Sequence, residues 1–279
     1  MNGVSKMQCN LEDLSIFYET YGAGRPIIML PGRPSDHNIM KRFMEPLFTE
    51  QDAWLRIYPD LPGTGLTPSL ERLATHDQMI ETMLAFIDAV IPGQRFILAG
   101  LSYGGYLARG VLAQRAASID GLLLCAPQVK ADPTQAQLPS RAIVVENPQL
   151  LTSASPHVAG LVEDLVVVQS EPVLEVMPIV LSEVIKADHA FNGRLEVAAP
   201  ASFEVDPQQA SFEAPTLILT ARQDHLCGYR DAWNLLENFP RATFAVLDRA
   251  GHFVNIEQDE LCRSLMREWL QRVKEYETR

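Results

Sequence analysis

The sequence reads Arg95-Phe96-Ile97-Leu98-Ala99-Gly100-Leu101-Ser102-Tyr103-Gly104-Gly105 at the point that decides its fold. The apolar run is typical of a strand buried on both faces, and residues 104–117 have the pattern of a helix. The pattern G-x-S-x-G falls at the junction, where larger side chains at the two glycines would collide with the neighbouring strand and helix. Such a turn exposes a serine hydroxyl, which is a weak nucleophile unless a base lies beside it. The alternative is an ordinary turn in which Ser102 only caps the helix.

The rest of the chain repeats this alternation of strands and helices. The predicted strands are residues 14–19, 26–30, 54–58, 95–100, 121–126, 215–220 and 243–247, and the predicted helices outside the middle section are 77–90, 104–117 and 257–276. This rhythm predicts an α/β fold, with a mostly parallel central sheet and helices on both of its faces.

The rhythm breaks between residues 128 and 213, which are rich in proline. Residues 161–169 and 173–185 have helical patterns, and Pro178 is expected to interrupt the second. We therefore predict a core domain, residues 1–127 and 214–279, and a mostly helical cap, residues 128–213. The cap is expected over the carboxyl edge of the sheet, where open α/β sheets bind ligands.

A base and an acid for Ser102 are sought after the late strands. Among the six histidines, His252 follows a late strand through a short loop and precedes the closing helix. Asp224 follows the preceding strand and can orient the histidine. The rival carboxylates are Asp248, four residues before His252, and the more distant Asp132.

Together these features resemble the α/β-hydrolase superfamily, specifically its capped serine hydrolases with a nucleophile elbow. The resemblance covers nearly the whole chain and lies in the motif around Ser102, Asp224 and Gly251-His252; residues 60–65 also resemble the family's D-x-x-G-x-G loop. It implies that Ser102, Asp224 and His252 form a catalytic triad and that no cofactor or metal is needed.

The loop after residues 26–30 departs from this family. Pro31 stands where the family usually has histidine, in Leu30-Pro31-Gly32-Arg33-Pro34. The resemblance implies an oxyanion hole made by the backbone amides of Tyr103 and Arg33, with Gly32 allowing the turn.

The same loop supplies candidate substrate contacts. The guanidinium of Arg33 either binds a substrate carboxylate or turns to solvent. His37 either lines the same pocket or lies on the surface. Gly32, Arg33 and His37 are therefore the predicted substrate-binding residues.

Composition narrows the partners and the location. The chain has 35 acidic and 23 basic residues and a formal net charge of −12, which argues against nucleic acid or an anionic membrane as a partner. It contains no apolar run long enough to span a bilayer, and its four scattered cysteines are typical of reduced thiols. We expect a cytoplasmic protein, and a homo-oligomer remains open.

The expected function is a serine hydrolase that cleaves a small carboxylic ester or a related acyl substrate through an acyl-enzyme. In relatives, haloalkane dehalogenases and epoxide hydrolases use an aspartate where this chain has Ser102. The alternatives are an acyltransferase, an aminopeptidase or a C–C bond hydrolase with the same triad, or a ligand-binding protein without turnover.

Overall fold

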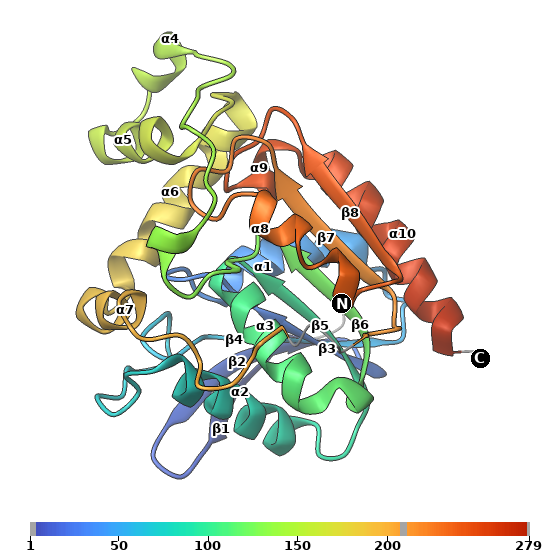
Figure 1. Ribbon diagram of the computed structural model, residues 1–279. Coiled ribbons are helices and arrows are strands. Elements are labelled where there is room, and N and C mark those ends of the chain that lie inside the picture. Colours follow the sequence, from blue (N-terminus) through green and yellow to red (C-terminus); the bar gives the residue numbers. More distant parts are fainter. Residues whose placement is uncertain (1–3, 207–210, 278–279) are drawn as a thin grey trace.

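One sheet of eight strands organises residues 4–206 and 211–277, the part of the chain that this computed structural model describes (Figure 1). The strands are β1 (Ser5–Asn10), β2 (Ser15–Tyr21), β3 (Arg25–Leu30), β4 (Trp54–Pro59), β5 (Phe96–Leu101), β6 (Ile119–Cys125), β7 (Thr216–Ala221) and β8 (Ala242–Leu247). Their order in the sheet is β1-β2-β4-β3-β5-β6-β7-β8. The pairs β1–β2 and β2–β4 are antiparallel, and all other pairs are parallel. The predicted α/β fold with a mostly parallel sheet is confirmed.

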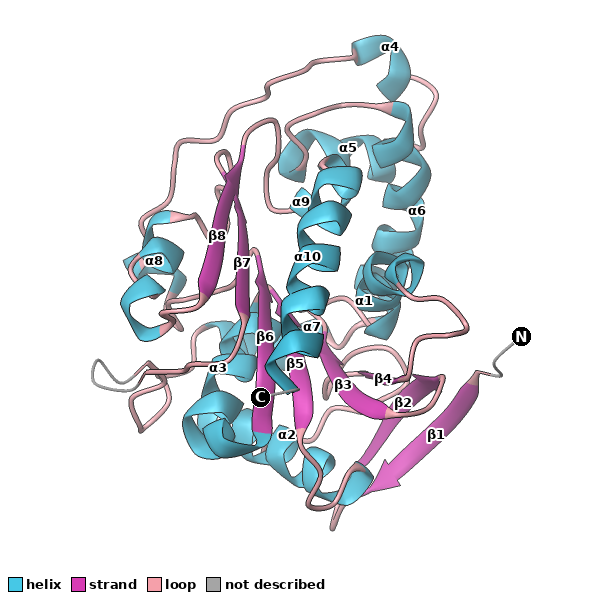
Figure 2. Ribbon diagram, turned by 90° about the vertical axis from the view of Figure 1, so that its right-hand side faces the viewer, coloured by secondary structure: helices cyan, strands magenta, loops and turns pink. Residues whose placement is uncertain are grey.

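Helices cover both faces of this sheet. The helices are α1 (His37–Met44), α2 (His76–Val90), α3 (Tyr103–Arg115), α4 (Pro148–Leu151), α5 (Pro156–Leu165), α6 (Glu171–Lys186), α7 (His189–Glu196), α8 (Arg230–Trp233), α9 (Val254–Glu257) and α10 (Asp259–Glu277). Figure 2 shows α1 and α10 on one side of the sheet and α2 and α3 on the other. Each face has its own apolar core, one including Phe86 and Leu107 and the other including Phe43 and Trp269.

Local interactions explain where several of these elements begin and pack. Helix α2 begins at a capping box. The Thr75 hydroxyl accepts from the backbone amide of Gln78, and the side-chain oxygen of Gln78 accepts from the backbone amide of Thr75. Helix α10 is fixed to the sheet by Trp269, whose buried indole Nε1 donates to the carbonyl of Pro215 over 3.0 Å. Strand β5 is buried at every residue because both of its faces are covered.

The structure corrects the sequence prediction at three places. Strand β1 was not predicted because it is an edge strand, with only Cys9 buried, and is held by its backbone pairing with β2. Helix α6 is not interrupted, because burial of residues such as Met177 at about 1.5–3 kcal/mol each outweighs the hydrogen bond that Pro178 cannot donate. Helix α5 ends at Leu165 and not at residue 169, since the valine run 166–168 favours extended backbone and Val145 donates to Val167.

Helices α4 to α7 all belong to the long connection between β6 and β7. Figure 1 shows them beside the end of the sheet toward which the parallel strands point. In the described part of this connection, the extended pairing consists of one bridge between Val145 and Val168. Two hydrogen bonds from Asn192 and Asp188 to the carbonyl of Gly63 help to hold α7 against the core.

Two glycines allow α3 to pack directly on the strands before it. A Cβ atom on Gly104 would lie 2.2 Å from the carbonyl oxygen of Leu30, and one on Gly100 would lie 2.3 Å from the carbonyl oxygen of Gly104. Both are backbone atoms, one at the end of β3 and the other in the first turn of α3, so they have little room to move.

We expect Gly104→Ala to lower the free energy of unfolding by about 2–3 kcal/mol or more, because the added methyl group must push α3 away from β3. Urea denaturation measures this change. The control is Gly160→Ala in α5, where nothing lies within 4 Å of an added Cβ and a helical alanine should stabilise by up to about 1 kcal/mol. Equal stability of Gly104→Ala and the unaltered protein would contradict this account of the packing.

Candidate active site

Ser102 occupies a strained turn between β5 and α3. Its φ of 53° lies in the left-handed region, which residues other than glycine rarely adopt. Its amide donates to the carbonyl of Cys125 over 3.0 Å, and its own carbonyl accepts from the amides of Gly105 and Gln128 over 2.9 Å each. These bonds hold the turn in a conformation that is unfavourable in isolation. The hydroxyl therefore has a fixed position above the carboxyl end of β5.

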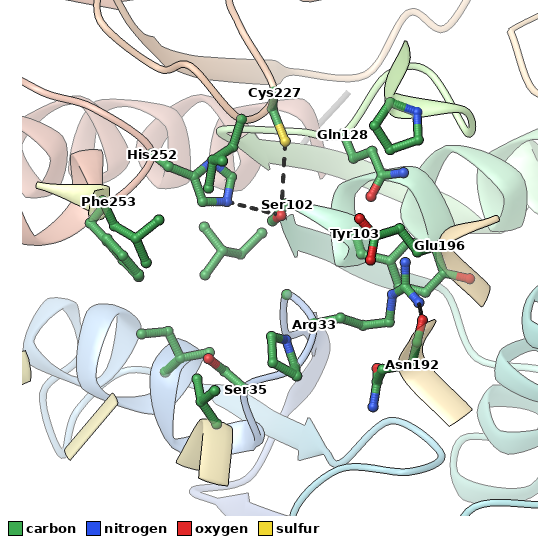
Figure 3. A pocket seen from close by; sticks show the side chains of 18 of the residues that line it. Arg33, Ser35, Ser102, Tyr103, Gln128, Asn192, Glu196, Cys227, His252 and Phe253 are labelled. Atoms are coloured by element: carbon green, nitrogen blue, oxygen red, sulfur yellow. Dashed lines mark hydrogen bonds between the residues drawn. The ribbon is translucent and has the colours of Figure 1, made fainter. Parts of the chain in front are cut away.

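The structure brings Ser102, His252 and Asp224 together although the chain separates them widely. Ser102 Oγ lies 3.0 Å from His252 Nε2 (Figure 3), and His252 Nδ1 lies 3.1 Å from Asp224 Oδ2. With Nδ1–H donating to the carboxylate, Nε2 is left as an acceptor for the serine proton. The geometry matches the requirement of a serine nucleophile for an adjacent, oriented base.

Burial and hydrogen bonds set the charges of this group. Burial opposes ionisation of Asp224, but His252 and the amides of Cys227 and Leu226 hold the pKa of this carboxyl below its usual range. The two amides donate to Asp224 Oδ1 over 3.0 and 2.9 Å. Burial also opposes the imidazolium form of His252, yet the neighbouring carboxylate raises its pKa well above the ordinary value. A stronger base at this position favours removal of the serine proton.

The two rival carboxylates lie elsewhere. Asp248 is exposed, and its Oδ1 accepts from Gln223 Nε2 over 2.8 Å. Asp132 caps the short turn that follows it, accepting from the amide of Thr134 over 2.9 Å. Of the three candidates, Asp224 is the one that contacts His252.

Gly32 places the loop after β3 against Ser102. A Cβ atom on Gly32 would lie 2.9 Å from Ser102 Cβ, so only glycine permits this approach. Tyr103 begins α3, and amides in the first turn of a helix have no acceptor within the helix. The amides of Arg33 and Tyr103 thus belong to the two segments that flank Ser102, as their predicted oxyanion role requires.

A cavity of about 440 Å³ opens beside these residues. Its size suits a small organic molecule. Its walls combine residues that precede or follow core strands with residues of α5 to α7, and they include Gly32, Arg33, Leu101, Ser102, Gln128, Leu161, Leu165, Val180, Asn192, Glu196, Cys227 and His252. The guanidinium of Arg33 points into this region toward Tyr103 and Asn192 and not into solvent (Figure 3).

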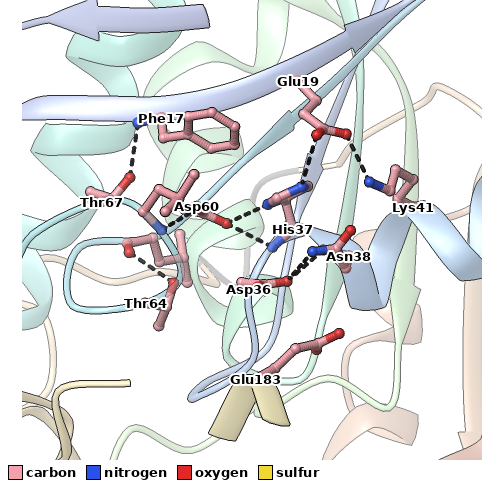
Figure 4. Close-up of polar contacts among 12 residues, drawn as sticks. Phe17, Glu19, Asp36, His37, Asn38, Lys41, Asp60, Thr64, Thr67 and Glu183 are labelled. Atoms are coloured by element: carbon pink, nitrogen blue, oxygen red, sulfur yellow. Dashed lines mark hydrogen bonds and ion pairs between the residues drawn. The ribbon is translucent and has the colours of Figure 1, made fainter. Parts of the chain in front are cut away.

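The position of His37 corrects the prediction that its side chain lines the pocket. Its Nδ1 lies 2.7 Å from Asp60 Oδ1, and its Nε2 faces Glu19 Oε1 at 3.6 Å (Figure 4). Burial opposes the charged form, but Asp60 and the other nearby carboxylates raise the pKa of His37 overall. The backbone amides of His37 and Leu66 also donate to Asp60. The buried carboxylate therefore holds the segment after β3 against the loop after β4.

Glu183 on α6 lies close to the same group (Figure 4). Its side chain is buried and its Oε1 is 3.4 Å from Arg42 Nη2 on α1. Burial and the negative charge of Asp36 raise the pKa of Glu183 to about 7, against the opposing effect of Arg42.

Sequence reasoning missed Cys227, which lies directly at the site. Its Sγ is 3.9 Å from Ser102 Oγ, and it lines the cavity. The signal available was its place three residues after Asp224, but a scattered cysteine has no distinguishing pattern. The other three cysteines are buried, and none of them lines the cavity.

Sequence reasoning also missed Glu257, at the end of α9. Its Oε2 accepts from the amide of Gly251 over 2.7 Å, and its Oε1 accepts from the amides of Val167 and Val168 over 2.7 and 2.9 Å. One carboxylate therefore joins the loop of His252 to the segment that follows α5. In the sequence Glu257 resembles an ordinary acidic residue at the start of a helix.

Two groups of side chains among residues 4–206 and 211–277 bring atoms that could bind a metal ion within 4.8 Å of one another; these atoms are imidazole nitrogens, a thiol sulfur and carboxylate oxygens. The groups are Asp224, Cys227 and His252, and Asp36, His37 and Asp60. Both include hydrogen bonds that an ion would have to displace, and we assign a metal to neither.

The chain belongs to the alpha/beta hydrolase family, whose profile it matches over residues 27–264. The AB hydrolase superfamily protein YisY of Bacillus subtilis (strain 168) is 25% identical over 260 residues, covering 91% of this chain and 95% of the relative. A solved alpha/beta superfamily hydrolase from Oenococcus oeni PSU-1 is 26% identical with a TM-score of 0.84, covering 93% and 96% of the two chains. A thermophilic esterase from Thermogutta terrifontis is 22% identical with a TM-score of 0.71, covering 97% and 99%. Membership of the α/β-hydrolase superfamily, which the sequence resemblance indicated, is confirmed, and the family supports a hydrolase.

Within the described ranges, none of the helices combines the length and apolar character needed to cross a bilayer.

We expect alkylation of Cys227 by iodoacetamide to slow the reaction of Ser102 with a fluorophosphonate by at least about tenfold, because the added group fills space beside the hydroxyl. Intact-mass spectrometry follows both modifications. Cys227→Ala should remove the effect, whereas Cys9→Ala, on the edge strand, should leave it in place. Blocking that persists in Cys227→Ala would assign it to a different thiol.

Stability should depend on pH through Glu183. A folded-state pKa raised to about 7 from 4.5 means that its contribution to stability is fully present below about pH 4.5 and is lost as the pH rises through about 7. The quantity to compare is the free energy of unfolding of Glu183→Gln against that of the unaltered protein. The difference should shift in favour of the variant by about 1–2 kcal/mol when the pH is raised from 5 to 8.5, at about 1.4 kcal/mol per pKa unit less solvent screening. Urea denaturation at both pH values measures this shift. Glu175→Gln, on an exposed position of the same helix, should show no such shift.

Proposed function

We propose that the protein is a serine hydrolase that cleaves a small carboxylic ester or a related acyl substrate through an acyl-enzyme. One observation carries the proposal: the two hydrogen bonds of 3.0 and 3.1 Å that link Ser102 through His252 to Asp224. A serine, a base within reach of it and a buried carboxylate behind the base are the groups that acyl transfer requires.

In the first half of the reaction, Ser102 Oγ attacks the acyl carbon while His252 Nε2 takes its proton. The carbonyl oxygen then carries a negative charge, and the amides of Tyr103 and Arg33 donate hydrogen bonds to it. Asp224 stabilises the imidazolium that has formed. When the C–O bond to the alcohol breaks, His252 returns the proton to the departing oxygen, and the acyl group remains on Ser102 as an ester.

In the second half, water replaces the alcohol. His252 takes a proton from the water, whose oxygen attacks the acyl carbon of the ester. The bond to Ser102 Oγ then breaks and the serine recovers its proton from His252. The acid leaves, and the three residues return to their starting states.

In this proposal residues 128–213 act as a cap above the core, residues 1–127 and 214–279. The support is that the cavity has walls from both parts, with Leu161, Val180 and Asn192 facing the same space as Ser102 and His252. The cavity volume of about 440 Å³ favours a small substrate. The Thermogutta terrifontis protein, which has the same fold, is an esterase, and this agrees with the proposed chemistry.

Intact-mass spectrometry after exposure to a small fluorophosphonate tests the nucleophile. We expect one adduct on the unaltered protein and none on Ser102→Ala, because the reagent needs an activated hydroxyl. The absence of an adduct on folded, unaltered protein would refute the proposal in favour of a binding protein. Turnover of an ester that is accelerated by an added alcohol, with a new ester as product, would identify acyl transfer.

The acid is tested by two matched aspartates. Asp224→Asn should slow fluorophosphonate labelling and ester turnover by about 10³-fold or more, because the amide no longer fixes the tautomer of His252. Asp248→Asn, at an exposed position, should change both rates by less than about twofold. The reverse order of the two effects would move the acid to Asp248.

A further inference from the structure

Arg33 introduces a positive charge into the wall of the cavity beside Ser102. Its guanidinium carbon lies 4.0 Å from the centre of the Tyr103 ring, and its Nη1 donates to the carbonyl of Asn192 over 3.0 Å (Figure 3). Stacking on the ring and the bond to α7 fix the direction of the side chain. Its position is thus set from both sides of the cavity.

Among the described residues this charge has no hydrogen-bonded anionic partner, although the negative charge of Glu196 acts on it from an exposed position. Arg33 forms no ion pair in the described part of the chain, and its Nε, although shielded from solvent, has no hydrogen-bond acceptor. Burial lowers the pKa of the guanidinium, but an arginine remains charged at neutral pH. A shielded charge without a counter-ion is unfavourable, and a ligand anion removes this penalty.

The neighbouring titratable groups form no ion pair with Arg33 among the described residues. Burial and the charge of Arg33 lower the pKa of His76, beneath Tyr103, to about 4, so this imidazole is neutral at physiological pH. Glu196 and Lys130 also line the cavity, and both are exposed to solvent at its rim. The formal net charge of the chain is −12, so the molecule as a whole repels anions. The guanidinium of Arg33, which has no ion-pair partner among the described residues, is a local exception inside the cavity.

We propose that Arg33 binds a second carboxylate of the acyl substrate, so that the preferred substrates are half-esters of dicarboxylic acids or similar anionic acyl compounds. The inference rests on the proposed function of Ser102 and names the substrate class. With Nη1 bonded to Asn192 and Nε shielded from solvent, Nη2 is the donor of the guanidinium that remains accessible. A charge-assisted hydrogen bond from Nη2 to a carboxylate oxygen fits this position.

Monoethyl glutarate and the ethyl ester of glutaric monoamide are a matched pair of probes, because they differ only in replacing the carboxylate by a neutral amide. We expect the half-ester to have a kcat/KM about 10- to 100-fold higher than that of the amide, as expected for a charge-assisted hydrogen bond. Arg33→Met should bring this ratio close to one. Arg33→Lys, which keeps the positive charge but not the planar guanidinium, should keep part of the preference for the half-ester.

Lys130→Met is the control at the rim of the cavity and should change the ratio by less than about twofold. Glu196→Gln removes a competing negative charge and should leave the ratio equal or higher. A ratio near one in the unaltered protein, or a ratio that collapses in Lys130→Met and persists in Arg33→Met, would overturn the proposal.

Calorimetry on Ser102→Ala separates this inference from the proposed function, because it measures binding without turnover. The half-ester should bind at least about tenfold tighter than the amide ester, and Arg33→Met in the same background should abolish the difference. Fluorophosphonate labelling without such a difference would refute the anion site and leave the hydrolase intact. The difference without labelling would refute the hydrolase and leave the anion site intact.

Discussion

The close contact of α3 with the strands before it is the constraint on which the site depends. Gly100 and Gly104 remove the side chains that would separate these backbones, and Ser102 takes a left-handed conformation between them. The same contact brings Gly32 against Ser102 and so places the loop after β3. In the proposed function, a serine fixed in this way needs no rearrangement before it reacts, which is the advantage of a preorganised site.

The sequence was informative wherever backbone rules dominate. Parallel strands end at a common edge, and the resemblance to the α/β-hydrolase superfamily placed Ser102, Asp224 and His252 after such strands. The three residues do meet. The sequence was uninformative where contacts depend on side-chain packing between distant segments. His37 was assigned to the pocket but is held behind the loop by Asp60, and Cys227 and Glu257 have no local pattern that marks them.

Charge is distributed unevenly in this molecule. Its acidic surface coexists with buried groups whose charges are balanced locally, as Asp60 balances His37 and Asp224 balances His252. Arg33 departs from this rule within the described residues, since its contacts are a ring face and a backbone carbonyl. Local imbalance of this kind is characteristic of positions that complete their interactions with a ligand.

Glu257 links the loop that carries His252 to the segment that follows α5. Its carboxylate grips the amides of Val167 and Val168 with one oxygen and that of Gly251, the residue before His252, with the other. A displacement of residues 167–168 would therefore strain the hydrogen bond that Gly251 donates to the same carboxylate. The positions of these two segments, which lie far apart in the sequence, are tied to each other through one side chain.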